Sequence, residues 1–149
     1  MSAEDLLAGT KLAMCMADIA VMMAATAHSL RENTGLSSAV SGSSIWRHGY
    51  LSAELADYED VASFTAWVEV VTRDNVALSC YLELRFHADR WVAERSVDEN
   101  LSEGPMSIFE YDSRTFESLP LLAAEIPALV HELTRDFAKS VEQRMSKNS

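Results

Sequence analysis

The stretch V-A-L-S-C-Y-L-E-L-R-F, residues 76–86, decides the fold. Every second side chain along it is apolar: Val76, Leu78, Cys80, Leu82, Leu84 and Phe86. The positions between them carry small or polar groups, among them Tyr81, Glu83 and Arg85. A period of two is typical of a β-strand with one buried and one solvated face. The stretch therefore predicts a central strand of an antiparallel sheet.

Neighbouring stretches extend this strand into a meander within residues 45–112. Strands are predicted over 45–56, 64–72, 90–97 and, less regularly, 106–111. Phe64, Ala66, Val68 and Val70 share one face of the second of these strands. A three-residue loop around Asp74 and Asn75 keeps all even-numbered apolar residues on one side of the sheet. A two-residue loop at Ala88 and Asp89 sets Phe86 opposite Trp91.

Helical patterns lie on both sides of the meander. Residues 1–33 predict a long helix that is apolar almost all round between Leu12 and Ala25, which indicates burial on more than one side. Its methionines could fill an uneven core or form a dimer surface. Residues 34–44 contain five serines and two glycines and predict a flexible connector. Residues 115–145 predict a second helix, in which Pro127 should cause a kink or a restart.

These elements predict one α+β domain over residues 1–149. Its parts are a long N-terminal helix, a four- to five-stranded antiparallel meander and a C-terminal helix, with both helices on one face of the sheet. A chain of 149 residues can bury such a core without disulfides or metals.

Charge and cysteine content limit the function classes. Asp and Glu outnumber Lys and Arg 23 to 12, and the net charge is −11. Such a chain repels nucleic acids and anionic membranes and attracts basic proteins. Only two cysteines occur, Cys15 and Cys80, which indicates a reducing, cytoplasmic setting. The apolar stretch in the first helix holds Asp18 and follows the acidic Glu4 and Asp5, so we expect neither a signal peptide nor a membrane span.

No catalytic, cofactor-binding or metal-binding pattern stands out. His131-Glu132 starts like a zinc-protease helix but lacks a second histidine one turn later. The glycines form no phosphate loop, and Ser41-Gly42-Ser43-Ser44 lacks the pattern of a hydrolase nucleophile. The sequence predicts a protein without enzymatic activity, cofactor or metal.

The outer face of the predicted sheet is the candidate binding surface. Large aromatic residues alternate there with carboxylates, and aromatic residues are frequent binding hot spots. The candidate residues are Trp46, Tyr50, Glu54, Asp57, Glu59, Asp60, Trp67, Glu69, Tyr81 and Glu83. A second run of carboxylates, from Asp98 to Asp112, either consists of solvated strand ends or adds to an acidic docking surface.

With these residues the chain resembles bacterial immunity proteins, which protect a cell from its own polymorphic or contact-delivered toxins. The likeness lies in small size, acidity and the Trp67, Tyr81, Glu69 and Glu83 face, without a diagnostic motif. It implies an antitoxin that covers a basic active-site surface of a toxin domain. Two alternatives stay open: a chaperone for a secreted effector, dimeric through the Met-rich helix, and a small ligand-binding domain or enzyme. Such chaperones usually interleave a helix within the sheet, which this sequence does not predict.

Overall fold

The computed structural model describes residues 2–47, 60–87 and 90–146, with the backbone alone for residues 4–8, 46–47, 60–61 and 87. The elements are listed in chain order: α1 (Ala3–Arg31), β1 (Leu36–Arg47), β2 (Asp60–Thr72), β3 (Ala77–His87), β4 (Trp91–Leu101), β5 (Gly104–Glu110), β6 (Arg114–Phe116) and α2 (Leu119–Ser146). The predicted α+β class and the order of helix, antiparallel meander and helix are confirmed.

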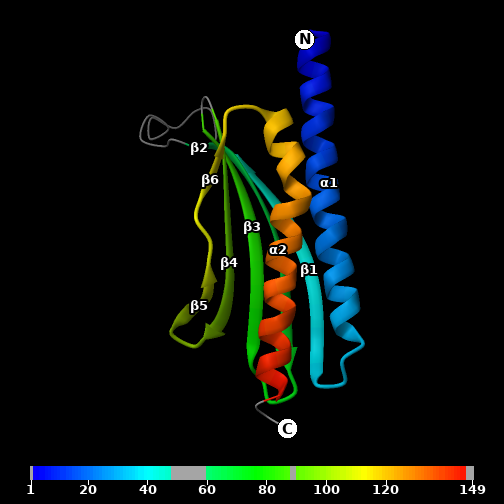
Figure 1. Ribbon diagram of the computed structural model, residues 1–149, viewed down its shortest axis with the longest axis vertical. Coiled ribbons are helices and arrows are strands. Elements are labelled where there is room, and N and C mark those ends of the chain that lie inside the picture. The colour runs from blue at the N-terminus through cyan, green and yellow to red at the C-terminus, as the bar shows by residue number, and fades with distance from the viewer. Residues whose placement is uncertain (1, 48–59, 88–89, 147–149) are drawn as a thin grey trace.

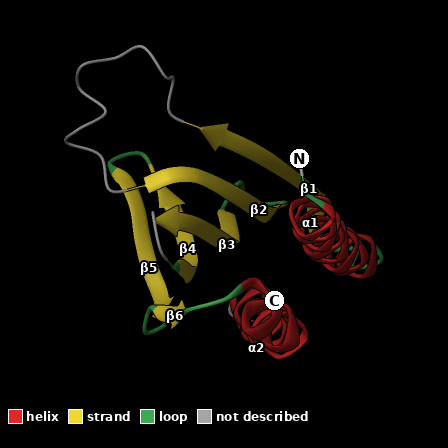
Figure 2. Cartoon of the chain, turned by 90° about the horizontal axis from the view of Figure 1, so that it is seen from above, coloured by secondary structure: helices red, strands yellow, loops and turns green. Residues whose placement is uncertain are grey.

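The sheet is antiparallel, and its strands lie in the order β1-β2-β3-β4-β5, with β6 also paired to β4. Both helices cover the same face of this curved sheet and run in the same direction (Figures 1 and 2). The core lies between helices and sheet. It includes Ile19 and Met23 from α1, Val68 and Leu82 from the central strands, and Phe137 from α2, each fully buried.

The registers predicted for the central strands are correct. Thr72 donates its backbone N–H to the carbonyl of Val76 at 2.8 Å, which leaves a three-residue loop. Asn75 ends this loop with φ 71°, a left-handed conformation that asparagine tolerates. Phe86 pairs with Trp91 as expected, while residues 88–89 lie outside the described residues. Every second residue of β2 and β3 therefore faces the helices.

The predicted connector over residues 34–44 is wrong, because β1 begins at Leu36, nine residues before the predicted first strand. β1 is an edge strand. Its side chains on the helix side become more exposed toward the end of the strand, from Ala39 at 2% to Ile45 at 66%. Backbone pairing with β2 holds the strand instead, and Arg31 of α1 donates from Nε to the Ala39 carbonyl at 2.7 Å. A strand held mainly by its backbone needs no alternating apolar pattern. The rest of the predicted strand, residues 48–56, lies outside the described residues.

Three further expectations need correction. The predicted second helix begins too early, because Thr115 and Phe116 belong to the short strand β6 and α2 starts only at Leu119. There the Leu121 N–H donates to the Ser118 hydroxyl at 3.4 Å. α2 continues through Pro127, so the predicted alternative of a restart is wrong, while that of a kink stays a prediction. α1 buries one face rather than several, and Met14 and Val21 on its other side are 61% and 67% exposed.

Candidate functional site

The sheet face opposite the helices forms the candidate site. Within the described part of the chain, neither helix lies over this face of β2 and β3 (Figure 2). A shallow hollow of about 510 Å³ lies at its centre. The side chains along it come from β2, β3 and the end of β4, and we call this surface the open face: Thr65, Trp67, Glu69, Ser79, Tyr81, Glu83 and Asn100.

Two aromatic side chains occupy the middle of the open face. Trp67 on β2 and Tyr81 on β3 are direct cross-strand partners and are both partly exposed. On its other side Trp67 pairs with Gly42 of β1, and a Cβ atom at Gly42 would stand 2.5 Å from Cζ2 of the indole. The indole of Trp67 can therefore lie over β1 only because residue 42 has no side chain.

Carboxylates stand beside this aromatic pair. Glu69 accepts a hydrogen bond from Nδ2 of Asn100 at 3.4 Å, and Asn100 also binds the Ser79 hydroxyl at 3.2 Å. Glu83 accepts from the Thr65 hydroxyl at 3.4 Å. The Thr65–Glu83 and Asn100–Ser79 contacts join adjacent strands, while Asn100 reaches Glu69 from β4 across β3, so the sheet orients both carboxylates.

The electrostatic field around Tyr81 is negative. Burial raises the pKa of its phenol, and Asp98, Glu83 and Glu94 raise it further. The hydroxyl therefore stays protonated at neutral pH and can donate a hydrogen bond. Arg85 limits this field on one side, since it forms ion pairs with Glu94 and, at 3.5 Å, with Glu83.

The structure brings together four of the ten predicted binding residues: Trp67, Glu69, Tyr81 and Glu83. Trp46 and Asp60 lie at the ends of β1 and β2 that lead into residues 48–59, and only their backbone is described. Tyr50, Glu54, Asp57 and Glu59 lie outside the described residues.

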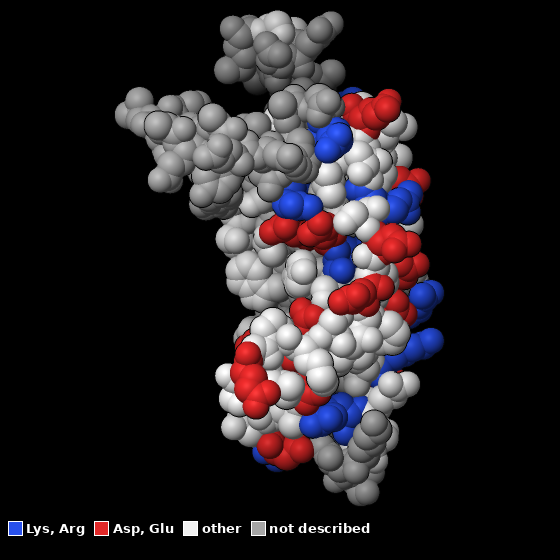
Figure 3. All heavy atoms as spheres, turned by 90° about the vertical axis from the view of Figure 1, so that its left-hand side faces the viewer, with Lys and Arg blue, Asp and Glu red and all other residues white. Residues whose placement is uncertain are grey.

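The second carboxylate run does not form one docking surface. Asp98 faces away from the helices but is 9% exposed and accepts a hydrogen bond from the Ser96 hydroxyl at 2.6 Å. Glu99 faces α2, where its Oε1 lies 3.1 Å from Nη2 of Arg144. Acidic and basic side chains are interspersed on the side of the molecule that carries β5 and β6 (Figure 3). Strand alternation separates these neighbouring residues, because consecutive side chains point to opposite faces.

Three contributors to the open face were not predicted, namely Gly42, Ser79 as a partner of Asn100, and Asn100 itself. A fourth strand extended to Leu101 would have placed Asn100 beside Ser79 by alternation alone. Gly42 had no such signal, because its role depends on the rotamer of Trp67.

The buried guanidinium of Arg95 explains the carboxylate of the zinc-protease-like pair. Glu132, from the His131-Glu132 pair, binds buried Arg95 at 2.9 Å, and Arg95 also donates to the Leu129 carbonyl at 3.1 Å. Among the described residues, no three His, Cys, Asp or Glu side chains gather in a way that could hold a metal ion.

Comparisons of the chain with protein-family models, with curated proteins and with solved structures find no match.

Proposed function

We propose that this chain is an inhibitor of the immunity-protein type, which binds a basic toxin domain through its open face. One observation carries the proposal: Trp67 and Tyr81 pair across two strands, with carboxylates beside them, on a face over which no described helix lies. Tryptophan and tyrosine bury a large area and still offer a polar atom, so they are effective anchors in protein interfaces.

The carboxylates would orient the partner. Glu69 and Glu83 are held at the rim of the aromatic pair, and the whole chain carries a net charge of −11. A basic surface that handles nucleotides or nucleic acid would be drawn to this field and meet the open face first. Once bound, the sheet would deny that surface to its substrate. The inhibitor itself needs no catalytic group.

The rigidity of the sheet supports this role. The open face lies on the central strands, whose opposite side is packed against the core by Val68, Cys80 and Leu82. A binding site on central strands is formed before the partner arrives, so little conformational entropy is lost on binding. The uninterrupted meander also differs from the interleaved helix of the effector chaperones considered as an alternative.

The test is a capture experiment with single variants. The tagged chain is immobilised at low salt and exposed to lysate of its source organism, and a retained basic protein is then purified and its binding measured. Trp67→Ala should weaken that binding by about 2 kcal/mol, or roughly 30-fold, mainly through faster dissociation. Glu69→Lys should slow association and reduce its dependence on salt.

A matched control uses the helix side of the molecule. Leu121, which is 56% exposed, and Glu142 lie on α2, and Leu121→Ala with Glu142→Lys repeats the same kinds of change there. This variant should bind like the wild type. The captured protein should also be toxic when expressed alone and harmless when co-expressed with this chain. Equal capture by all variants, or a partner whose toxicity is not relieved, would refute the proposal.

A further inference from the structure

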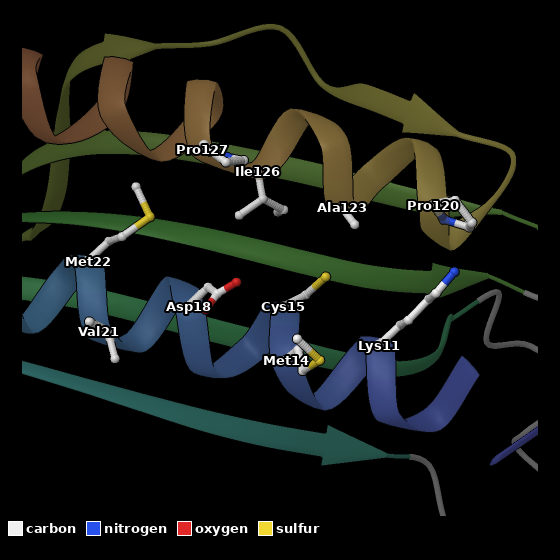
Figure 4. Close-up of a pocket in the computed structure, with 10 residues that line it drawn as sticks. All are labelled: Lys11, Met14, Cys15, Asp18, Val21, Met22, Pro120, Ala123, Ile126 and Pro127. Atoms are coloured by element: carbon white, nitrogen blue, oxygen red, sulfur yellow. The ribbon is translucent and has the colours of Figure 1, made fainter. Parts of the chain in front are cut away.

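A groove between the two helices lies on the opposite side of the molecule from the open face. It has a volume of about 570 Å³. Lys11, Cys15, Asp18 and Met22 of α1 point toward the side of α2 that carries Ile126 (Figure 4). The groove is mainly apolar and is open to solvent along the first half of both helices.

α1 has more apolar surface than its own domain uses. Residues Gly9–Arg31 are long and apolar enough to cross a membrane by length and composition, yet only 22% of the most apolar window is buried. A stripe of exposed residues follows α1 at alternating steps of three and four: Lys11, Met14, Asp18, Val21, Ala25 and His28. Such spacing is that of a helix seam that packs against another helix.

The charged residues of this stripe are complementary to those of the same stripe on a second, antiparallel copy. Lys11 and Asp18 lie seven residues apart, two turns along one side of α1, and Met14 lies between them. If a second α1 runs antiparallel about a two-fold axis near Met14 and Cys15, Lys11 of each copy comes close to Asp18 of the other. Within the described residues neither Lys11 nor Asp18 has an ion-pair partner, so both charges are available for this contact.

We propose that two copies of this chain form a two-fold dimer, in which the α1 helices pair antiparallel along the groove between α1 and α2. The charge distribution favours a second copy at this surface. Within Gly9–Arg31 the charged residues are Lys11, Asp18 and Arg31, although the chain as a whole carries a net charge of −11. Two acidic chains therefore repel each other only weakly along this part of the helix. A lipid surface suits it less, because Asp18 would enter the apolar layer without a partner.

Charge reversal tests the pairing directly. In sedimentation equilibrium the wild type should show twice the mass of one chain. Lys11→Asp places two aspartates opposite each other at both contacts of the dimer, and Asp18→Lys places two lysines there. Each variant alone should therefore dimerise at least about tenfold more weakly. Mixed together, the two variants should form a heterodimer, since every contact then joins opposite charges. The double variant Lys11→Asp with Asp18→Lys should dimerise like the wild type.

Two controls make the result specific. Lys139→Asp and Glu142→Lys make the same changes in net charge at exposed positions of α2 and should leave the dimer unchanged. All four residues are exposed, so circular dichroism and urea unfolding should show folded proteins. A monomeric wild type, or a dimer that neither α1 variant weakens, would overturn the proposal. A wild type that floats as a monomer with phosphatidylcholine vesicles would assign the helix to a lipid surface instead.

The dimer is independent of the proposed inhibitor function. Its interface lies on the helix side, so both open faces of the dimer remain accessible and could each take one partner. Loss of dimerisation in Asp18→Lys should therefore leave partner binding intact, while Trp67→Ala should leave the dimer intact. The two proposals can thus fail separately.

Discussion

The indole of Trp67 occupies the space that a side chain on Gly42 would need, with Cζ2 only 2.5 Å from the position of a Cβ atom. The two residues are cross-strand partners on β1 and β2. One position on an edge strand therefore controls the orientation of the central aromatic residue of the open face.

Substitution of Gly42 should disturb that orientation. Gly42→Ala should lower the free energy of unfolding by about 1 to 2 kcal/mol, because the indole or β1 must shift, and it should weaken partner binding to a similar degree as Trp67→Ala. Urea unfolding and binding titration measure the two effects. Gly9→Ala is the control, since an added Cβ there meets nothing within 4 Å. Because alanine favours the helix more than glycine does, Gly9→Ala should raise the free energy of unfolding by up to about 1 kcal/mol. A fully stable, binding-competent Gly42→Ala would contradict the assignment.

The thiol of Cys80 should make the protein less stable in alkali. Burial raises its pKa from 9.0 to about 12, and Asp98 adds to the rise. Above pH 9 the unfolded chain loses this proton while the folded chain keeps it, so the free energy of unfolding falls as pH rises from 9 toward 12. The contribution is up to about 1.4 kcal/mol per pH unit. Urea unfolding at several pH values should show a shallower decline for Cys80→Ala. If the free energy of unfolding falls equally with pH in the wild type and in Cys80→Ala, the pKa of the Cys80 thiol is not raised by folding.

A hydrogen bond from Tyr111 to α2 should contribute measurably to stability. The Tyr111 hydroxyl donates to Oδ2 of Asp136 at 2.6 Å, and its ring lies 4.4 Å from the guanidinium carbon of Arg95. Tyr111→Phe keeps the ring contact and removes the hydrogen bond, so it should cost about 1 to 2 kcal/mol of unfolding free energy in thermal or urea unfolding. Ser113→Ala removes only an exposed contact with Glu94 and should cost less than about 0.5 kcal/mol. Equal effects would argue against a special role of Tyr111.

Replacement of Pro127 should stabilise the protein. α2 is continuous through this exposed residue, although proline cannot donate to the carbonyl of Ala123. Pro127→Ala supplies that donor and should raise the free energy of unfolding by about 1 to 3 kcal/mol. Pro120 lies in the first turn, where the missing N–H has no helical partner, so Pro120→Ala should change stability by less than about 0.5 kcal/mol. A loss of stability in Pro127→Ala would indicate that the proline ring packs in an essential way.

The central strands were predictable from the sequence because they obey one simple rule. Residues 64–72 and 77–85 bury one face under the helices, so burial alternates with every residue there. The apolar face fixes the register, and the register places Trp67 opposite Tyr81. The core of α2 was predictable for the same reason, as Leu122, Leu133 and Phe137 are fully buried at helical spacing.

The periphery was not predictable, because its elements are held by backbone contacts or by partners distant in sequence. The sequence of β1 resembles a Ser-rich linker, because few of its side chains are buried and they need not be apolar. β6 is only three residues long, too short for a recognisable pattern. The position of Trp67 over Gly42 depends on a rotamer, which no pattern reveals. The sequence predicts burial of α1 on more than one side, which is wrong within one chain because apolar composition does not distinguish a buried face from an unpartnered one.

The meander order of the strands has a consequence for the speed of folding. β2, β3 and β4 each pair with the next strand along the chain, and the turn between β2 and β3 has three residues. Short loops lose little entropy on closing, and folds dominated by such local contacts reach their native state rapidly. Contacts between α1 and α2, by contrast, join the two ends of the chain and should form last. We therefore expect the open face to assemble before the helices dock.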